Sequence, residues 1–190
     1  MSQDLTTSVY RGVLDGEIAH DDLSARRLCR YLGKTTGALY HHYGSLDRLL
    51  FEVSQLAYED LRAQLEAAFA AHRDLGDVAV AFVEFGLDNP ELYPLMFERR
   101  YDYAALRDGG AFDRTIESAL MLDAVGLMLA EAGSDDVAMD GRLFFAGLHG
   151  LVSLAASGRA NVRALDRTDR DVACDTARAL AERILKTTPP

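Results

Sequence analysis

The placement of proline constrains this chain more than any other feature of its sequence. The four prolines among the 190 residues are Pro90, Pro94, Pro189 and Pro190. Proline breaks a helix when it stands in the interior, so two long stretches can each hold several uninterrupted helices. Neither stretch shows the sustained alternation of apolar and polar residues that is typical of strands. The sequence therefore predicts an all-α fold.

Apolar residues spaced three and four apart predict four helices in the first part of the chain. The first helix covers about 6–19, although Gly12 and Gly16 lower its helix propensity. Two short helices follow it. A long fourth helix covers about 46–71, and the boundary between two domains is expected inside it.

The predicted domains are a small one of residues 1–52 and a larger one of residues 53–190. The larger domain should hold helices at 78–87, 90–97, 112–132, 136–157 and 168–185. Residues 99–110 lack a clear period and are expected to form a loop or broken turn. The chain is 49% hydrophobic and 26% charged, a composition that allows a substantial buried core.

The two short helices have the spacing of a helix-turn-helix. Ser24 can cap the first of them, which stops at Gly33, and Thr35 or Thr36 can cap the second, which stops at Gly44. In this motif the second helix enters the major groove of DNA, with its N-terminal residues against base edges. Many small α-hairpins share the spacing, so spacing alone is a weak indication of DNA binding.

Charge is distributed unevenly along the chain. The segment from Leu23 to Arg48 contains five basic residues and one acid, a local net charge of +4 in a chain whose formal net charge is −10. The remainder therefore carries −14. Because phosphate binding depends on Lys and Arg, this asymmetry concentrates any attraction for DNA in the one segment that has helix-turn-helix spacing.

The segment from Leu23 to Leu50 resembles the N-terminal domain of the tetracycline-repressor (TetR) family. The most specific part is GALYHHY, residues 37–43, which is followed by Gly-Ser and a leucine-rich helix. The resemblance implies a homodimeric transcriptional regulator that binds a palindromic DNA operator, as a repressor released by a small molecule. It implies no enzymatic activity and no cofactor.

The resemblance also implies which residues contact DNA. Those expected at base edges are Arg26, Thr36 and Gly37. Those expected at the sugar–phosphate backbone are Ser24, Thr35, Tyr40 and His42. His41 stands where the family often places a variable, sometimes base-contacting residue. Arg48 would partly replace a lysine that the family often has at the position of Leu46.

A second, weaker resemblance lies in residues 88–97 and 143–154. It is to a TetR regulatory domain with a Trp-x-x-x-His-Gly pattern, in which Phe145 takes the tryptophan position before His149 and Gly150. In the family the last two long helices pair with their symmetry mates. The resemblance therefore implies dimerisation through the helices predicted at 136–157 and 168–185.

Aromatic residues and methionines in the larger domain are candidates to line a cavity for a hydrophobic effector. The candidate ligand-binding residues are Phe82, Met96, Phe97, Tyr101, Met121, Met128, Phe145 and His149. Such residues also fill ordinary cores wherever helices cross, and His149 also fits a structural histidine. Both interpretations remain open at the level of sequence.

Other kinds of function have little support in the sequence. No nucleophile–base pair, glycine-rich phosphate loop or HExxH motif argues for a small helical enzyme or ligand carrier. A purely structural interaction module would not explain the basic segment. Cys29 and Cys174 are too isolated to indicate a disulfide framework or a metal site. No long apolar run or signal-like N-terminus occurs, so we expect a cytoplasmic protein that does not bind membranes.

Overall fold

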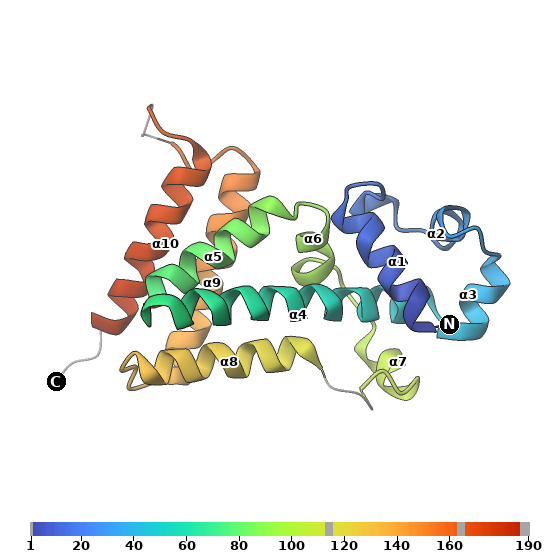
Figure 1. Cartoon of the computed structure of the whole chain (residues 1–190), viewed down its shortest axis with the longest axis horizontal. Helices are drawn as coiled ribbons and strands as arrows, with labels where there is room; N and C mark the ends of the chain where they lie inside the picture. Colours follow the sequence, from blue (N-terminus) through green and yellow to red (C-terminus); the bar gives the residue numbers. More distant parts are fainter. Residues whose placement is uncertain (1, 113–115, 163–165, 187–190) are drawn as a thin grey trace. The chain divides into compact units, whose positions relative to one another are not determined.

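The computed structural model describes residues 2–112, 116–162 and 166–186 (Figure 1). These residues form ten α-helices and one 3-10 turn, and the described part of the chain contains no strand. This confirms the all-α prediction. By their contacts the helices divide into two compact units, one of residues 1–60 and 91–118 and the other of residues 61–90 and 119–190. The functional boundary at residue 52 stays a prediction.

The first unit contains the N-terminal helices together with two short helices from the middle of the chain. They are α1 (Ser2–Leu14), the 3-10 turn η1 (His20–Asp22), α2 (Ala25–Tyr31), α3 (Thr36–Tyr43), the beginning of α4 (Leu46–His72), α6 (Leu92–Phe97) and α7 (Tyr103–Asp108). The ranges of α2, α3 and α4 agree with those predicted from the sequence.

The prediction for the first helix was wrong at both ends, because α1 covers Ser2–Leu14 rather than 6–19. Gly16 has a φ of +71°, which ends the helix early. Gly12 remains inside the helix for a packing reason: a Cβ there would lie 2.8 Å from the Tyr31 ring of α2. Glycine at this position therefore lets α2 approach α1 closely.

Tyrosine hydroxyl groups attach the middle segment to the first part of α4. Tyr101 donates to the backbone oxygens of Leu50 (3.2 Å) and Leu95 (3.0 Å), and Tyr58 donates to that of Met96 (2.8 Å). The prediction of a loop at 99–110 was also wrong, since α7 forms there. Asp102 is the N-cap of α7. The helix has only six residues, too few to show an apolar period in the sequence.

The second unit contains the long helices of the C-terminal half. They are the end of α4, α5 (Leu75–Asp88), nearly all of α8 (Glu117–Glu131), α9 (Val137–Ala156) and α10 (Asp169–Lys186). Helices α5, α9 and α10 pack against one another. Gly147 of α9 lies directly against the side chain of Leu180 in α10, where any Cβ would collide. The small residues Ala173 and Ala177 are completely buried within this unit.

Candidate nucleic-acid interface

Local capping defines the two helices of the helix-turn-helix. The Ser24 hydroxyl accepts from the backbone N–H of Arg27 (3.3 Å), and the Thr35 hydroxyl accepts from that of Ala38 (3.2 Å). The turn between the helices contains Gly33 with a φ of +62°, a conformation that favours glycine. Thr35 is therefore the cap of α3, and Thr36 is its first residue, with a hydroxyl not used for capping.

A small core holds α3 in place. Leu28 of α2 is fully buried, and Leu39 and Tyr43 of α3 are 3% and 4% exposed. The Tyr43 hydroxyl lies 2.9 Å from the hydroxyl of Thr6 in α1, which satisfies both groups inside this core. One face of α3 is thus committed to packing, and the opposite face remains exposed.

Most residues with a predicted DNA contact are exposed. Ser24, Arg26, Thr35, Thr36, Gly37, Tyr40 and His41 are exposed, whereas His42 and Arg48 are half-buried. The Tyr40 side chain is an exposed aromatic ring on α3, with half of its surface accessible. The structure therefore leaves the helix start, its hydroxyl groups and Tyr40 available to a large partner.

The cations of the segment differ in how far they are already paired. Arg48 donates through Nε to Glu52 (3.2 Å), and Arg27 forms an ion pair with Asp22 (3.0 Å). Within the described part of the chain, Arg26 and Lys34 have no ion-pair partner. The charge of Arg48 is thus partly compensated, while that of Arg26 is available to an external anion.

Arg99 contacts the basic segment from outside it, and the sequence did not indicate this contact. Its guanidinium donates to Asp47 (2.7 Å), the one acid within the basic segment, and lies 5.7 Å from the centre of the Tyr101 ring. Because Asp47 is compensated from outside the segment, it subtracts less from the positive potential there. No local pattern in the sequence could have revealed this contact, since the two residues are 52 positions apart.

Glu91 also makes a contact, with His20, that the sequence did not indicate. One carboxylate oxygen accepts from the backbone N–H of His20 (2.7 Å) and lies 2.9 Å from its ring Nδ1. The backbone N–H of His20 is the main reason that the pKa of Glu91 lies below its usual value. The contact joins η1, which immediately precedes the helix-turn-helix, to the residue that precedes α6.

The candidate ligand residues of the second unit are mostly core. Phe82, Met121 and Met128 are 1%, 2% and 6% exposed, and the half-buried Phe145 packs its ring edge-on against Phe82 at 5.6 Å. His149 is half-buried on α9. Phe82, Met121 and Met128 thus have the burial of packed side chains, whereas Phe145 and His149 keep part of their surface accessible.

The other candidate ligand residues belong to the first unit. Phe97 packs against Tyr58 and Tyr93, with ring centres 5.4 Å and 4.7 Å apart. Met96 and Tyr101 are 6% and 9% exposed, and Tyr101 uses its hydroxyl for the backbone bonds described above. The eight candidates are thus divided between two units, and their role in ligand binding stays a prediction.

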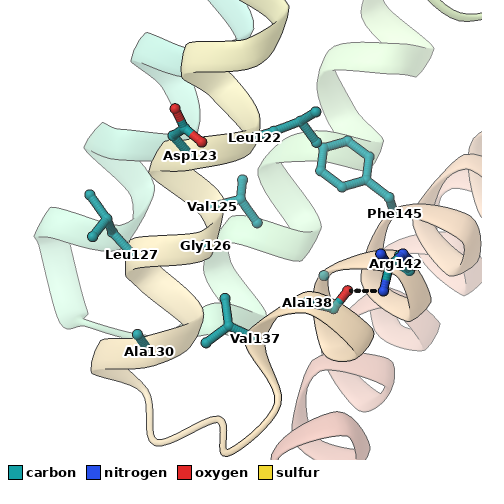
Figure 2. Close-up of a pocket in the computed structure, with 11 residues that line it drawn as sticks. Leu122, Asp123, Val125, Gly126, Leu127, Ala130, Val137, Ala138, Arg142 and Phe145 are labelled. Atoms are coloured by element: carbon teal, nitrogen blue, oxygen red, sulfur yellow. Dashed lines mark hydrogen bonds between the residues drawn. The ribbon is translucent and has the colours of Figure 1, made fainter.

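A groove of about 750 Å³ lies between α8 and α9 of the second unit (Figure 2). Phe145 is the one candidate ligand residue in its lining. The lining residues are Leu122, Asp123, Val125, Gly126, Leu127, Ala130, Val137, Ala138, Gly141, Arg142 and Phe145.

The described ranges contain neither a cluster of side chains suited to a metal ion nor a membrane-spanning helix. Among those residues no three His, Cys, Asp or Glu side chains are placed to hold a metal ion. No helix in the same ranges is long and apolar enough to cross a membrane. Burial raises the pKa of the Cys29 and Cys174 thiols, which disfavours the reactive thiolate form.

Residues 75–181, more than half of the chain, match the family model described as "Tetracyclin repressor-like, C-terminal domain". A segment of 49 residues is 43% identical to the HTH-type transcriptional repressor AcnR of Corynebacterium jeikeium (strain K411). That match spans 26% of this chain and 24% of the length of AcnR.

Solved structures share the fold at low sequence identity. SCO4313, described as a regulatory protein, has a TM-score of 0.66 and 18% identity, with 97% of this chain and 98% of that one covered. A protein from Rhodococcus sp. RHA1 has a TM-score of 0.66 and 24% identity, with 93% and 95% covered. These similarities concern the arrangement of the helices alone.

Proposed function

Because the chain belongs to the tetracycline-repressor family of transcriptional regulators, we propose that it represses genes by binding a palindromic operator as a homodimer, and that a small apolar effector releases it. The observation that carries the proposal is the exposed side of α3, with Thr36, Gly37 and Tyr40 available above a buried core. A side chain that reaches base edges must be exposed and positioned by a rigid helix.

The proposal divides the DNA contacts into two kinds. Arg26, Thr36 and Gly37 read base edges, with His41 as a variable contact. Ser24, Thr35, Tyr40, His42 and Arg48 hold the sugar–phosphate backbone. Contacts of the first kind discriminate between sequences, whereas contacts of the second kind position the protein on any duplex.

Dimerisation is expected because one helix-turn-helix is too small to bind DNA specifically by itself. A single recognition helix makes too few contacts for specific binding, so two are needed, spaced roughly 34–36 Å or somewhat more apart to meet successive major grooves. Helix α9 exposes Met139, Leu143 and Leu154, which suits pairing with a second copy. At Gly150, an added Cβ meets no atom within 4 Å. Gly150→Arg should therefore leave the protomer folded and disrupt pairing.

Effector control requires a ligand that binds two conformations unequally. A coupling free energy of about 1 to 3 kcal/mol changes operator affinity by about 5- to 150-fold. The apolar residues proposed to take part are Phe82, Met96, Phe97, Tyr101, Met121, Met128, Phe145 and, as a polar member, His149.

The proposal is tested by a gel-shift with duplexes from upstream of the protein's own gene and of neighbouring genes. We expect one duplex to be retained far more strongly than a scrambled one, and Arg26→Ala to lose that preference. Arg159→Ala is the matched control, since it removes the same charge from an exposed position of the second unit. Equal retention of every duplex by the wild-type protein would contradict the proposal.

A further inference from the structure

The first turn of α4 contains an acid next to the cation that is proposed to meet a phosphate. The Ser45 hydroxyl accepts from the backbone N–H of Arg48 (3.1 Å), so α4 begins directly after Ser45, and Asp47 stands in its first turn. The positive end of the helix dipole favours a carboxylate there. The same carboxylate repels a phosphate that approaches Arg48, because like charges at short distance raise the energy of the complex. Helix stability and DNA binding therefore make opposite demands on Asp47.

Arg99 of the middle segment, which we define as residues 91–112, compensates this acid. Its Nη2 donates to Oδ1 of Asp47 (2.7 Å), and the two side chains are 29% and 37% exposed. The same segment also lies against Arg48, since a Cβ at Gly109 would be 3.5 Å from Nη1 of Arg48. Both charged residues of the first turn of α4 thus have neighbours in the middle segment.

The ion pair of Arg99 is not what attaches the middle segment to α4. The Tyr101 hydroxyl already donates to the backbone oxygen of Leu50 (3.2 Å), and Tyr58 of α4 donates to that of Met96 (2.8 Å). Ion pairs between partly exposed side chains contribute little to stability. The Nε of Arg99 is buried and has no hydrogen-bond partner in the described ranges, which lowers stability. Stability alone therefore gives a weak reason for an arginine at this position.

We infer that Arg99 is a positioning residue for DNA binding, which neutralises Asp47 so that a phosphate can approach Arg48 without repulsion from the adjacent acid. The inference rests on the proposed function, in which Arg48 meets a phosphate, and it adds a residue from outside the helix-turn-helix. Arg99 acts through Asp47, to which it stays paired, and does not itself touch the duplex.

An electrostatic role of this kind depends on salt and not on the sequence of the duplex. Salt screens the repulsion between Asp47 and a phosphate, so loss of Arg99 should weaken binding most at low ionic strength. Phosphates are the same in every duplex, so the preference for the operator over a scrambled duplex should remain. A loss of packing around Arg99 would instead weaken binding at high salt as well.

The test is fluorescence anisotropy of the full chain on an upstream duplex and a scrambled one, at salt concentrations from about 50 to 300 mM. We expect Arg99→Gln to weaken binding to both duplexes at least about threefold at the lowest salt, the effect of one unit charge about 6 Å from a phosphate in water. The loss should be smaller at the highest salt. Arg170→Gln is the matched control, because it breaks the ion pair with Asp88 in the second unit and should leave binding unchanged.

A double variant separates the charge of Arg99 from its packing. Asp47→Asn removes the repelling charge, so adding it to Arg99→Gln should restore most of the lost affinity. Arg99→Lys keeps a cation near Asp47 and should lose less affinity than Arg99→Gln. Circular dichroism checks that the helices of each variant persist.

The outcomes separate this inference from the proposed function. If the wild type binds and Arg99→Gln binds equally well at low salt, the proposed function stands and the role of Arg99 is overturned. A double variant that stays as weak as Arg99→Gln would also overturn that role, since Arg99 would then act through packing or meet a phosphate itself. A wild-type chain that binds no duplex would overturn both.

Discussion

The helix-turn-helix and the α8–α9 region leave opposite kinds of side chain exposed. In the first, a small core of Leu28, Leu39 and Tyr43 is covered, and hydroxyl groups, Arg26 and the Tyr40 ring remain outside. In the second, leucines remain outside. Exposed hydroxyl groups and an unpaired cation suit phosphates and bases, whereas exposed leucines suit an apolar partner.

The contrast between buried and exposed leucines should produce the largest effect. Leu39→Ala removes a side chain that is 3% exposed and should lower the free energy of unfolding by about 2 to 5 kcal/mol. Leu127→Ala removes one that is 73% exposed and should change the stability of the protomer by less than about 0.5 kcal/mol. Urea unfolding, done with each variant at a concentration where it is monomeric, measures both. Equal losses would show that Leu127 is as important to the folded protomer as Leu39.

Base reading and phosphate binding should separate within the helix-turn-helix. Arg26→Ala should cost about 1 to 3 kcal/mol of discrimination between operator and scrambled duplex, with little change in non-specific binding. Tyr40→Phe should weaken binding to both duplexes to a similar extent, since phosphate contacts carry no sequence information. Fluorescence anisotropy measures the four affinities. Equal shifts on both duplexes for both variants would contradict the assignment.

The two adjacent threonines should differ in the quantity that they change. Thr35→Ala removes the N-cap of α3 and should lower stability by about 0.5 to 2 kcal/mol, with a typical cost near 1. Thr36→Ala removes an exposed hydroxyl that caps nothing and should leave the unfolding midpoint nearly unchanged while weakening operator binding. Thermal unfolding and anisotropy on the same samples distinguish the two roles. A reversed pattern would mean that Thr36 is the cap in solution.

The smallest expected effect concerns Glu91. Its lowered pKa means that its contact with His20 contributes stability that is fully present above the usual pKa of a glutamate and is lost as the pH falls through the lowered value. Glu91→Gln should therefore reduce stability slightly at neutral pH and make the acid side of the stability profile less steep. Urea midpoints between pH 3 and about 7 check this. Identical profiles for wild type and variant would exclude the contribution.

Local signals explain why the helices of the helix-turn-helix were predicted from the sequence, whereas the contacts that the middle segment makes with this part of the chain were not. Ser24, Thr35 and Gly33 act through neighbours three or fewer residues away, so the sequence displays the helix-turn-helix directly. The contacts of Arg99 with Asp47 and of Glu91 with His20 join positions 52 and 71 residues apart. No local pattern encodes such contacts.

The candidate ligand residues are divided between the two units, and the sequence could not separate cavity residues from core residues. Met96 and Tyr101 have the apolar pattern expected of a cavity, but the same pattern belongs to core residues, and here both are nearly buried. The groove between α8 and α9 depends on where two helices cross and on small residues such as Gly126 and Gly141. Only the tertiary arrangement reveals it.

The salt dependence of binding tests whether this acidic chain binds DNA through its short basic segment. Anisotropy with an upstream duplex should give a log–log slope of affinity against salt of about −0.9 for each phosphate neutralised. Arg48→Ala should reduce that slope by about one unit if Arg48 leaves Glu52 to meet a phosphate. A wild-type protein whose affinity for every duplex is negligible, or independent of salt, would contradict DNA binding through this segment.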